Sequence, residues 1–241
     1  MPIIYFVTFG GPTLNYHNAL NRICSEAEQM KTFNKIIPYD EKDLINDEKF
    51  WNKHGNFIIN NRRGFGYWLW KSYLIKKTMK EMNDNDILVY ADSGCSINLN
   101  GKPRLLEYFD IVNNSKFGIL SFKLEHLEKT WTKMDIIDYF GGVDLLETGQ
   151  LVGGIFILRK CDHTVNLVKK WYNGCCKYNL IDDSPSKISN DLSFKENRHD
   201  QSIFSILRKK LGTEIIMDET YFSPNWTIDG KNFPIWATRK I

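Results

Sequence analysis

Apolar residues follow two different spacings along this chain. Short apolar runs, the pattern of buried strands, recur at 3–8, 34–39, 87–91, 117–122 and 151–158. Apolar residues at every third or fourth position, the pattern of one-sided helices, recur over 19–30, 41–51, 67–82, 164–178 and 203–211. Strands that alternate with helices favour an α/β fold, in which helices cover both faces of a mostly parallel central sheet.

The segment 179–198 shows neither spacing. It is polar, contains Pro185 and is rich in Asp, Asn and Ser. Aperiodic segments of this length in a compact domain are usually lids, binding loops or disordered stretches. We therefore expect a mobile active-site loop, followed by a helix that stops at Gly212.

Composition bounds the organisation and the partners of the protein. No Pro/Gly/Ser linker divides the 241 residues, of which 42% are hydrophobic, so a single domain spanning 1–241 is expected. The formal charge of +3 and the short basic clusters at 76–77, 169–170 and 208–210 are too weak for a nucleic-acid footprint. We interpret these clusters as solvated helix faces, although one of them could help to hold a polyanionic diphosphate.

The cysteines and the N-terminus favour a cytoplasmic protein. The 5 cysteines are odd in number and lack metal-ligand spacing, which suits a reducing compartment. The first apolar run lacks the features of a signal peptide, and no segment reaches the roughly 18 apolar residues of a membrane span. We expect no transmembrane segment.

The first candidate site is the triplet Asp92-Ser93-Gly94, which follows the apolar run 87–91. Ligands of open α/β sheets bind at the carboxyl ends of strands. Asp92 and Ser93 can reach a ribose hydroxyl, a diphosphate or a divalent cation, and Gly94 lets the backbone approach a ligand. A plain strand end followed by a turn is the alternative, since all three residues are common in turns.

A second candidate is the segment 62–71, where glycines, aromatic residues and cations meet at the start of a helix. Lys71, one turn into that helix, is expected to offer a point charge to phosphate. Trp68 and Trp70 are expected to pack in the core or against the helix, and direct contact with a ligand is the alternative.

Two glycines, Gly153 and Gly154, interrupt the apolar run 151–158. Glycine inside a strand costs about 1 kcal/mol and marks a bulge or the close approach of another group. The sequence leaves two explanations open, a bulge against a neighbouring helix or a sugar ring that approaches the backbone.

The last candidate is His199-Asp200-Gln201, at the start of the final helix. The positive end of a helix favours an ionised Asp200, which can act as an N-cap, bind substrate hydroxyls, or do both. The remaining histidines lack metal-ligand spacing and are expected to be ordinary surface or helix residues: His17, His54, His126 and His163.

Taken in chain order, these motifs resemble the GT-A-fold glycosyltransferases, particularly small enzymes that build surface glycans in bacteria and large DNA viruses. The resemblance extends from Phe6 to Asp200 and implies one GT-A (Rossmann-like) domain. It implies a nucleotide-binding half at about 1–100 and an acceptor and donor-sugar half at about 101–241.

The resemblance also implies roles for individual residues. The nucleotide base would contact Thr8, Phe9 and Gly10, and Asp92-Ser93-Gly94 would replace the DxD motif that holds the ribose and the metal-bound diphosphate. Since Gly94 takes the place of the second carboxylate, Asp92 is the expected ligand of Mn²⁺ or Mg²⁺. Lys71 and Arg63 would stabilise the leaving diphosphate.

On the donor-sugar side, the resemblance places Gly153, Gly154 and His199 next to the donor and makes Asp200-Gln201 the catalytic pair. Asp200 would bind donor-sugar hydroxyls, and Gln201 would lie near the anomeric carbon. This pair favours transfer with retention of configuration. Inversion, with Asp200 as a general base toward the acceptor, is the alternative.

The expected activity is transfer of a sugar from a nucleotide-diphosphate sugar, with a UDP-sugar as the first candidate, to a glycan or another hydroxyl acceptor. A catalytically inactive nucleotide-sugar or carbohydrate-binding protein on the same fold is the alternative. A nucleotidyltransferase would carry a cation in the glycine-rich loop after the first strand, and Gly10-Gly11-Pro12 contains none.

Overall fold

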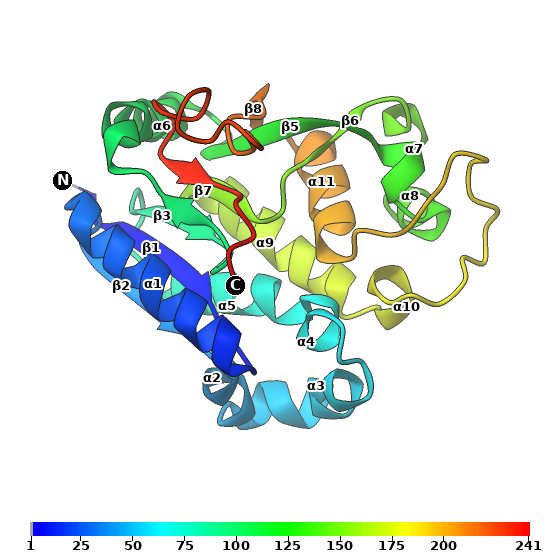
Figure 1. The fold of residues 1–241 in the computed structure, drawn as a ribbon. Helices are drawn as coiled ribbons and strands as arrows, with labels where there is room; N and C mark the ends of the chain where they lie inside the picture. The colour runs from blue at the N-terminus through cyan, green and yellow to red at the C-terminus, as the bar shows by residue number, and fades with distance from the viewer. Residues whose placement is uncertain (1) are drawn as a thin grey trace.

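A central sheet divides the molecule into two helical layers (Figure 1). The structure is a computed structural model, and it describes residues 2–241. Within this range the sheet consists of β1 (Ile4–Phe9), β2 (Lys35–Tyr39), β3 (Ile87–Ala91), β5 (Ile119–Leu127), β6 (Gly149–Leu151), β7 (Ile155–Arg159) and β8 (Glu214–Met217).

The strand order is β2-β1-β3-β7-β5-β6, and β8 pairs with β5. Parallel pairs join β1 to β2, β1 to β3 and β5 to β8, whereas β7 is antiparallel to β3 and β5, and β6 is antiparallel to β5. It follows that β6 and β7 alone among the seven described strands oppose the common direction. The expectation of an α/β fold with a mostly parallel sheet is confirmed.

Alternation of side chains along the strands supplies both core layers. Tyr5, Val7 and Phe9 of β1 join the core under α5 (Leu69–Glu81), α9 (Asp162–Cys175) and α11 (Asp200–Leu211). Phe6 joins the opposite core, under α1 (Leu14–Met30) and α6 (Lys102–Asn114). The two layers thus enclose the sheet, as Figure 1 shows.

Aromatic packing fixes α9 against α11. The rings of Trp171 and Phe204 are stacked with centroids 3.9 Å apart, and Phe156 of β7 meets both rings edge-on. Such pairs contribute about 0.5–1.5 kcal/mol beyond the area that they bury. This packing holds the first turn of α11 at a defined position relative to the sheet.

Three predicted elements are divided in the structure. The helix expected at 41–51 is two helices, α2 (Glu41–Ile45) and α3 (Glu48–Asn60), because Asp47 caps the second one by accepting a hydrogen bond from the Phe50 N–H at 3.1 Å. The strand expected at 151–158 is divided into β6 and β7 by Val152–Gly154. The segment 67–82 contains a left-handed Trp68 (φ 59°), which separates α4 (Gly64–Tyr67) from α5.

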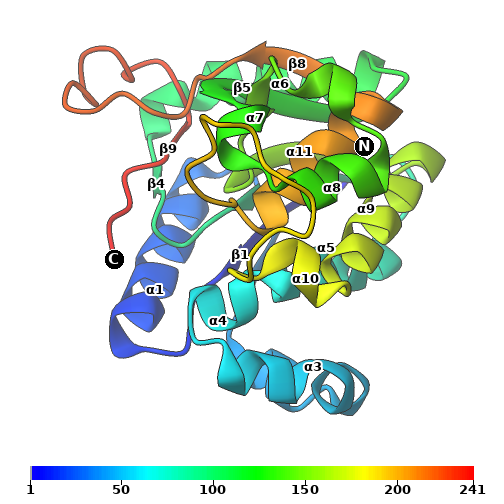
Figure 2. The ribbon, with the colours of Figure 1, turned by 90° about the vertical axis from the view of Figure 1, so that its right-hand side faces the viewer.

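The expected loop begins with one short helix, α10 (Tyr178–Ile181), and then runs without regular structure to α11. In Figure 2 the gold segment after α10 passes α7 (Glu128–Trp131) and α8 (Met134–Phe140). Backbone contacts agree, since the Lys187 N–H donates to Asp135 and the Lys195 N–H to the Thr130 carbonyl. The segment 182–198 is therefore tied by hydrogen bonds to α7 and α8.

A C-terminal segment returns to the carboxyl end of β3. The short strand β9 (Ile235–Trp236) pairs with β4 (Ser96–Ile97), and the Lys240 N–H donates to the Gly94 carbonyl at 2.8 Å. Within residues 2–241, no helix combines the length and the apolar character needed to cross a membrane. The 3-10 turns Leu99–Gly101 and Val143–Leu145 complete the described elements.

Candidate active site at the carboxyl end of β3

A buried lysine joins the two principal candidate carboxylates. Lys71 Nζ lies 3.1 Å from Asp92 Oδ1 and 3.5 Å from Asp200 Oδ2, and it donates a hydrogen bond to the Gly153 carbonyl at 3.3 Å. The four residues come from α5, the end of β3, the start of α11 and the link between β6 and β7. The structure therefore brings together four residues that lie far apart in the sequence, each of them a predicted site residue.

The charges in this cluster are strongly perturbed. Burial disfavours the Lys71 ammonium, but the Asp200 and Asp92 carboxylates outweigh burial and raise the pKa of Lys71 above its ordinary value. Burial raises the pKa of Asp200 to about 7, with Lys71 opposing the shift. At neutral pH the lysine is charged, and a pKa of about 7 leaves roughly half of the Asp200 carboxyl groups protonated.

The backbone of Asp200 is held in place, while one of its carboxylate oxygens lacks a hydrogen-bond partner among the described residues. The Trp171 indole N–H donates to the Asp200 carbonyl at 3.1 Å, which fixes the first turn of α11. Asp200 Oδ2 is buried, and its nearest donor within residues 2–241 is Lys71 Nζ at 3.5 Å, too far for more than a weak hydrogen bond. A hydroxyl brought next to this oxygen would find an unused acceptor.

Asp92 is the accessible member of the cluster. Its side chain is 42% exposed, and its Oδ1 also accepts a hydrogen bond from the Tyr90 hydroxyl at 2.7 Å. Burial and the nearby Asp92 raise the pKa of Tyr90 well above its usual value, so the phenol stays a donor. Tyr90 was missed in the sequence, although its position two residues before Asp92 places it on the same face of β3.

The two glycines make room for these side chains. A Cβ at Gly154 would lie 2.6 Å from Asp92 Oδ2, and a Cβ at Gly153 would lie 2.7 Å from Gln201 Cβ. The Gly153 N–H donates to Gln201 Oε1 at 2.9 Å, and the Asp92 N–H donates to the Gly154 carbonyl at 2.8 Å. The sequence left open a bulge against a neighbouring helix or a sugar ring close to the backbone. In the structure, α11 takes the space next to Gly153 and Asp92 takes the space next to Gly154.

Gln201 is oriented by a neighbour on the sheet. Its Nε2 donates to Gln150 Oε1 at 2.8 Å, while Gln150 Nε2 donates to the Trp131 carbonyl at 3.1 Å. Both amide functions of Gln201 are thus engaged within the protein. The residue fixes the Gly153 backbone relative to α11.

Ser93 and Gly94 face the C-terminal segment. Arg22 Nη2 donates to the Ser93 carbonyl at 2.9 Å and to the Lys240 carbonyl at 3.0 Å. A Cβ at Gly94 would meet nothing closer than 3.5 Å, from Arg239 Cα and Ile241 Cγ1. A side chain would therefore fit at position 94, so the packing of the C-terminal segment does not by itself require glycine there.

The residues after β1 pack into the protein. The Phe9 ring stacks on Trp70 with centroids 3.8 Å apart, and a Cβ at Gly10 would lie 2.5 Å from Leu20 Cβ. Thr8 is fully buried, and its hydroxyl has no hydrogen-bond partner among the described residues. Thr8 therefore offers an unused polar group, whereas Phe9 and Gly10 have packing contacts of their own.

Arg63 and His199 border the loop 182–198. Arg63 makes ion pairs with Asp183 at 3.2 Å and with Glu196 at 3.3 Å, near the two ends of this loop. His199 has φ 53°, a left-handed value, and its Nδ1 lies 2.6 Å from the Ile181 carbonyl, so this nitrogen carries the proton. Burial lowers the pKa of His199, which keeps the imidazole neutral.

A divalent cation fits Asp92 only with ligands from outside the protein. One of its oxygens already faces Lys71 and Tyr90, and Gly94 supplies no second carboxylate. Mg²⁺ sites commonly combine one or two carboxylates with substrate phosphates and water, so this donor set is compatible with a cation that arrives with a diphosphate.

Another group of potential ligands lies in the first turn of α1 and at the link from β2 to α2. His17, Asp40 and Glu41 place one ligand atom each within 4.8 Å of one another, the sole such group of three within residues 2–241. His17 Nε2 pairs with Glu41 Oε2 at 3.2 Å, which accounts for the contact without a cation. Among the other histidines, His54 lies in α3 as expected but is fully buried, between the Tyr172 and Tyr178 hydroxyls.

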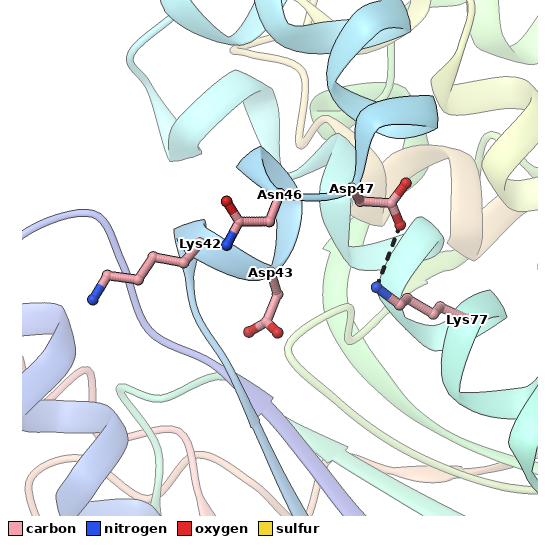
Figure 3. Close-up of a pocket in the computed structure, with 5 residues that line it drawn as sticks. All are labelled: Lys42, Asp43, Asn46, Asp47 and Lys77. Atoms are coloured by element: carbon pink, nitrogen blue, oxygen red, sulfur yellow. Dashed lines mark hydrogen bonds and ion pairs between the residues drawn. The ribbon is translucent and has the colours of Figure 1, made fainter.

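A surface hollow of about 420 Å³ lies elsewhere, between α2, α3 and α5 (Figure 3). Its walls carry both signs of charge: Lys42, Asp43, Asn46, Asp47 and Lys77. No member of the Lys71, Asp92 and Asp200 cluster contributes to it. The chemistry and the hollow are therefore separate features of this molecule.

Comparisons with known proteins place the fold. No protein-family model matches the sequence, and no curated protein matches it. A glycosyltransferase involved in the glycosylation of the major capsid of PBCV-1 superposes with a TM-score of 0.53 at 11% identity, over 98% of this chain and 92% of that one. Mouse xyloside xylosyltransferase 1 superposes with a TM-score of 0.51 at 11% identity, over 98% and 97% of the two chains. At these identities the likeness concerns architecture: the chain has a glycosyltransferase-like fold of the GT-A type, resembling that of viral glycosyltransferases.

Proposed function

We propose that this protein is a glycosyltransferase that moves a sugar from a nucleotide-diphosphate sugar, a UDP-sugar being the first candidate, to a hydroxyl of a glycan acceptor. The observation that carries the proposal is the buried Lys71 ammonium between Asp92 and Asp200 at the carboxyl end of β3. Strand ends are where ligands bind in α/β sheets. The likeness of the fold to two glycosyltransferases supports the same reading.

Lys71 and Asp92 would act on the leaving group. When the glycosidic bond breaks, negative charge grows on the departing diphosphate, and a fixed ammonium stabilises that charge without reorganisation. Lys71 is fixed in this way by three contacts and is 4% exposed. A cation held at Asp92 would add Lewis-acid stabilisation of the same phosphate oxygens.

Asp200 would act on the sugar or on the acceptor. Its buried, unused Oδ2 is suited to accept a hydrogen bond from a donor-sugar hydroxyl. Its pKa of about 7 also suits a general base, which would take the acceptor proton in an inverting reaction. Retention is our first proposal, because Asp200-Gln201 resembles the pair of retaining enzymes; NMR of the product anomer would decide between the two.

The proposal includes a reducing compartment. All five cysteines are free thiols, and Cys95 and Cys175 are buried. We infer a cytoplasmic location on this ground, to be checked by fractionation of expressing cells.

Turnover of nucleotide sugars tests the proposal directly. Purified protein is mixed with UDP-, GDP-, dTDP- and CMP-sugars, with and without Mn²⁺, and both release of the nucleotide and the thermal midpoint are measured. One donor family should be consumed by the wild type and not by Asp200→Asn, and the same donor should raise the midpoint, since a ligand bound to the native state stabilises it. Binding without turnover, in the presence of a panel of glycan acceptors, would favour an inactive sugar-nucleotide-binding protein, and absence of both would contradict the proposal.

A further inference from the structure

A hollow between α3, α5 and α9 gathers positive charge. Its volume is about 310 Å³, and lysines from two helices line it: Lys49 and Lys53 from α3, and Lys76, Lys77 and Lys80 from α5. Tyr172 of α9 forms part of its wall. We call this feature the lysine hollow.

The acidic residue on the wall does not balance these charges. Asp47 accepts hydrogen bonds from Lys77 Nζ at 3.3 Å and from the Tyr73 hydroxyl at 2.5 Å, and its contact with Lys77 is drawn in Figure 3. Within residues 2–241 the other four lysines of the hollow form no ion pair with a carboxylate. The hollow in Figure 3 shares Asp47 and Lys77 but also contains Asp43, so its charges are mixed.

Two of these lysines converge on one aromatic ring. Lys76 Nζ lies 4.7 Å and Lys53 Nζ 5.3 Å from the centre of the Tyr172 ring. Lys53 Nζ also donates to Cys176 Sγ at 3.3 Å. Burial and the neighbouring cations, first among them Lys80, lower the pKa of Lys76, as expected where like charges crowd together.

The geometry points to a binding site for phosphate groups: we propose that the lysine hollow binds a soluble polyphosphate anion, such as the di- or triphosphate of a metabolite. Lysine binds phosphate as a point charge, and several lysines from different helices can surround one such group. A concave site suits a small anion better than a flat lipid surface. Tyr172, 8% exposed, offers no protruding apolar group for a membrane.

This site is separate from the proposed donor site but lies on a shared helix. Lys76 follows Lys71 by five positions on α5, a rise of about 7.5 Å along the helix axis. Neither Lys71, Asp92 nor Asp200 lines the lysine hollow. The inference therefore goes beyond the proposed glycosyl transfer and does not depend on it.

Calorimetric titration with sodium tripolyphosphate tests the proposal. The titration is done at low salt and with EDTA, which removes the cations that would favour phosphate at Asp92. The wild type is compared with Lys53→Gln/Lys76→Gln and with a control, Lys187→Gln/Lys231→Gln, which removes the same charge at exposed positions elsewhere. The dissociation constant should rise at least about tenfold in the first variant and change less than about twofold in the control.

Three outcomes would overturn the proposal: no binding by the wild type, unchanged binding by Lys53→Gln/Lys76→Gln, or an equal loss in the control, which would reveal a general charge effect. Wild-type sedimentation with phosphatidylserine vesicles, without binding of free tripolyphosphate, would also overturn it in favour of a membrane surface. A second double variant, Lys49→Gln/Lys80→Gln, should weaken binding as well. It changes exposed residues only, so the test stands if the first variant fails to fold.

Discussion

Replacing Asp200 with asparagine should stabilise the protein at pH 8 while it removes activity. Burial raises the pKa of Asp200 from the ordinary value of 3.8 to about 7. Between these two pH values the folded protein keeps a proton that the unfolded chain has released. The free energy of unfolding therefore falls as the pH rises through this window, and it changes little from this group above pH 7.

The size of the effect follows from the two pKa values. The rise of about three units in the pKa of Asp200 corresponds to about 4 kcal/mol in the free energy of unfolding. About 2.5 kcal/mol of this is lost between pH 5 and pH 8. Asparagine has the shape of the protonated acid and does not titrate. Asp200→Asn should consequently be more stable than the wild type by up to about 4 kcal/mol at pH 8 and similar to it near pH 4, and activity should be lost because the carboxylate is gone.

Urea unfolding followed by tryptophan fluorescence at pH 5 and pH 8 measures this difference. Asp110→Asn is the matched control, since Asp110 is exposed on α6 and its change should stay within about 0.5 kcal/mol at both pH values. If Asp200→Asn is less stable than the wild type at pH 8, the attraction between Asp200 and Lys71 exceeds the cost of burial. Burial would then not be the dominant effect on the Asp200 carboxyl group.

Three further substitutions test the surroundings of this carboxylate. Lys71→Met should lower turnover, measured by nucleotide release, about 10²- to 10³-fold. It should also lower the free energy of unfolding, measured by urea titration, by about 3–5 kcal/mol, because two carboxylates lose their ammonium partner. Near-normal turnover would exclude Lys71 from the reaction. Gly154→Ala should reduce kcat at least about tenfold, because the new Cβ would lie 2.6 Å from Asp92 Oδ2 and would push that oxygen out of its position. Equal activity in Gly154→Ala and its control Gly94→Ala would contradict this. Arg208→Met should cost about 2–4 kcal/mol in urea unfolding, since the wholly buried guanidinium donates to the carbonyls ahead of Gly153 at 2.9 and 3.1 Å; a cost below about 0.5 kcal/mol would refute that role.

The sequence predicted those elements whose pattern is local. The run Ile87–Ala91 is buried at every residue, as a continuous apolar strand requires, and Gly212 ends α11 as expected. Gly153 and Gly154 indicated an irregularity within the run 151–158, but not that the run would be divided into two strands, β6 and β7. The cause of this division is a pair of contacts about 50 residues away in sequence, from Gln201 to the Gly153 N–H and from Arg208 to the Val152 carbonyl.

The candidate site was predictable residue by residue but not as an arrangement. Asp92 and Asp200 each stood out at the end of a strand or the start of a helix, and Lys71 stood out beside glycines. Nothing in their spacing indicates that one ammonium would lie within 3.5 Å of both carboxylates, because that distance depends on how α5 and α11 pack against β3. The packing contacts of Phe9 and Gly10 could not be predicted from the sequence either, because they are made with Trp70 and Leu20, which lie in other elements.

The energetics of the cluster argue for a functional rather than a structural role. Replacing a buried ion pair with well-packed apolar residues is often neutral or stabilising. Lys71 and Asp200 therefore stabilise the packing under α11 no better than apolar residues of similar volume would. The arrangement also leaves Asp200 Oδ2 without a hydrogen-bond donor and Asp92 partly exposed at the strand end. A purely structural ion pair would be expected to satisfy its own polar atoms. Here the unsatisfied oxygen and the exposed carboxylate flank the same ammonium, an arrangement that fits the proposed binding of a nucleotide sugar.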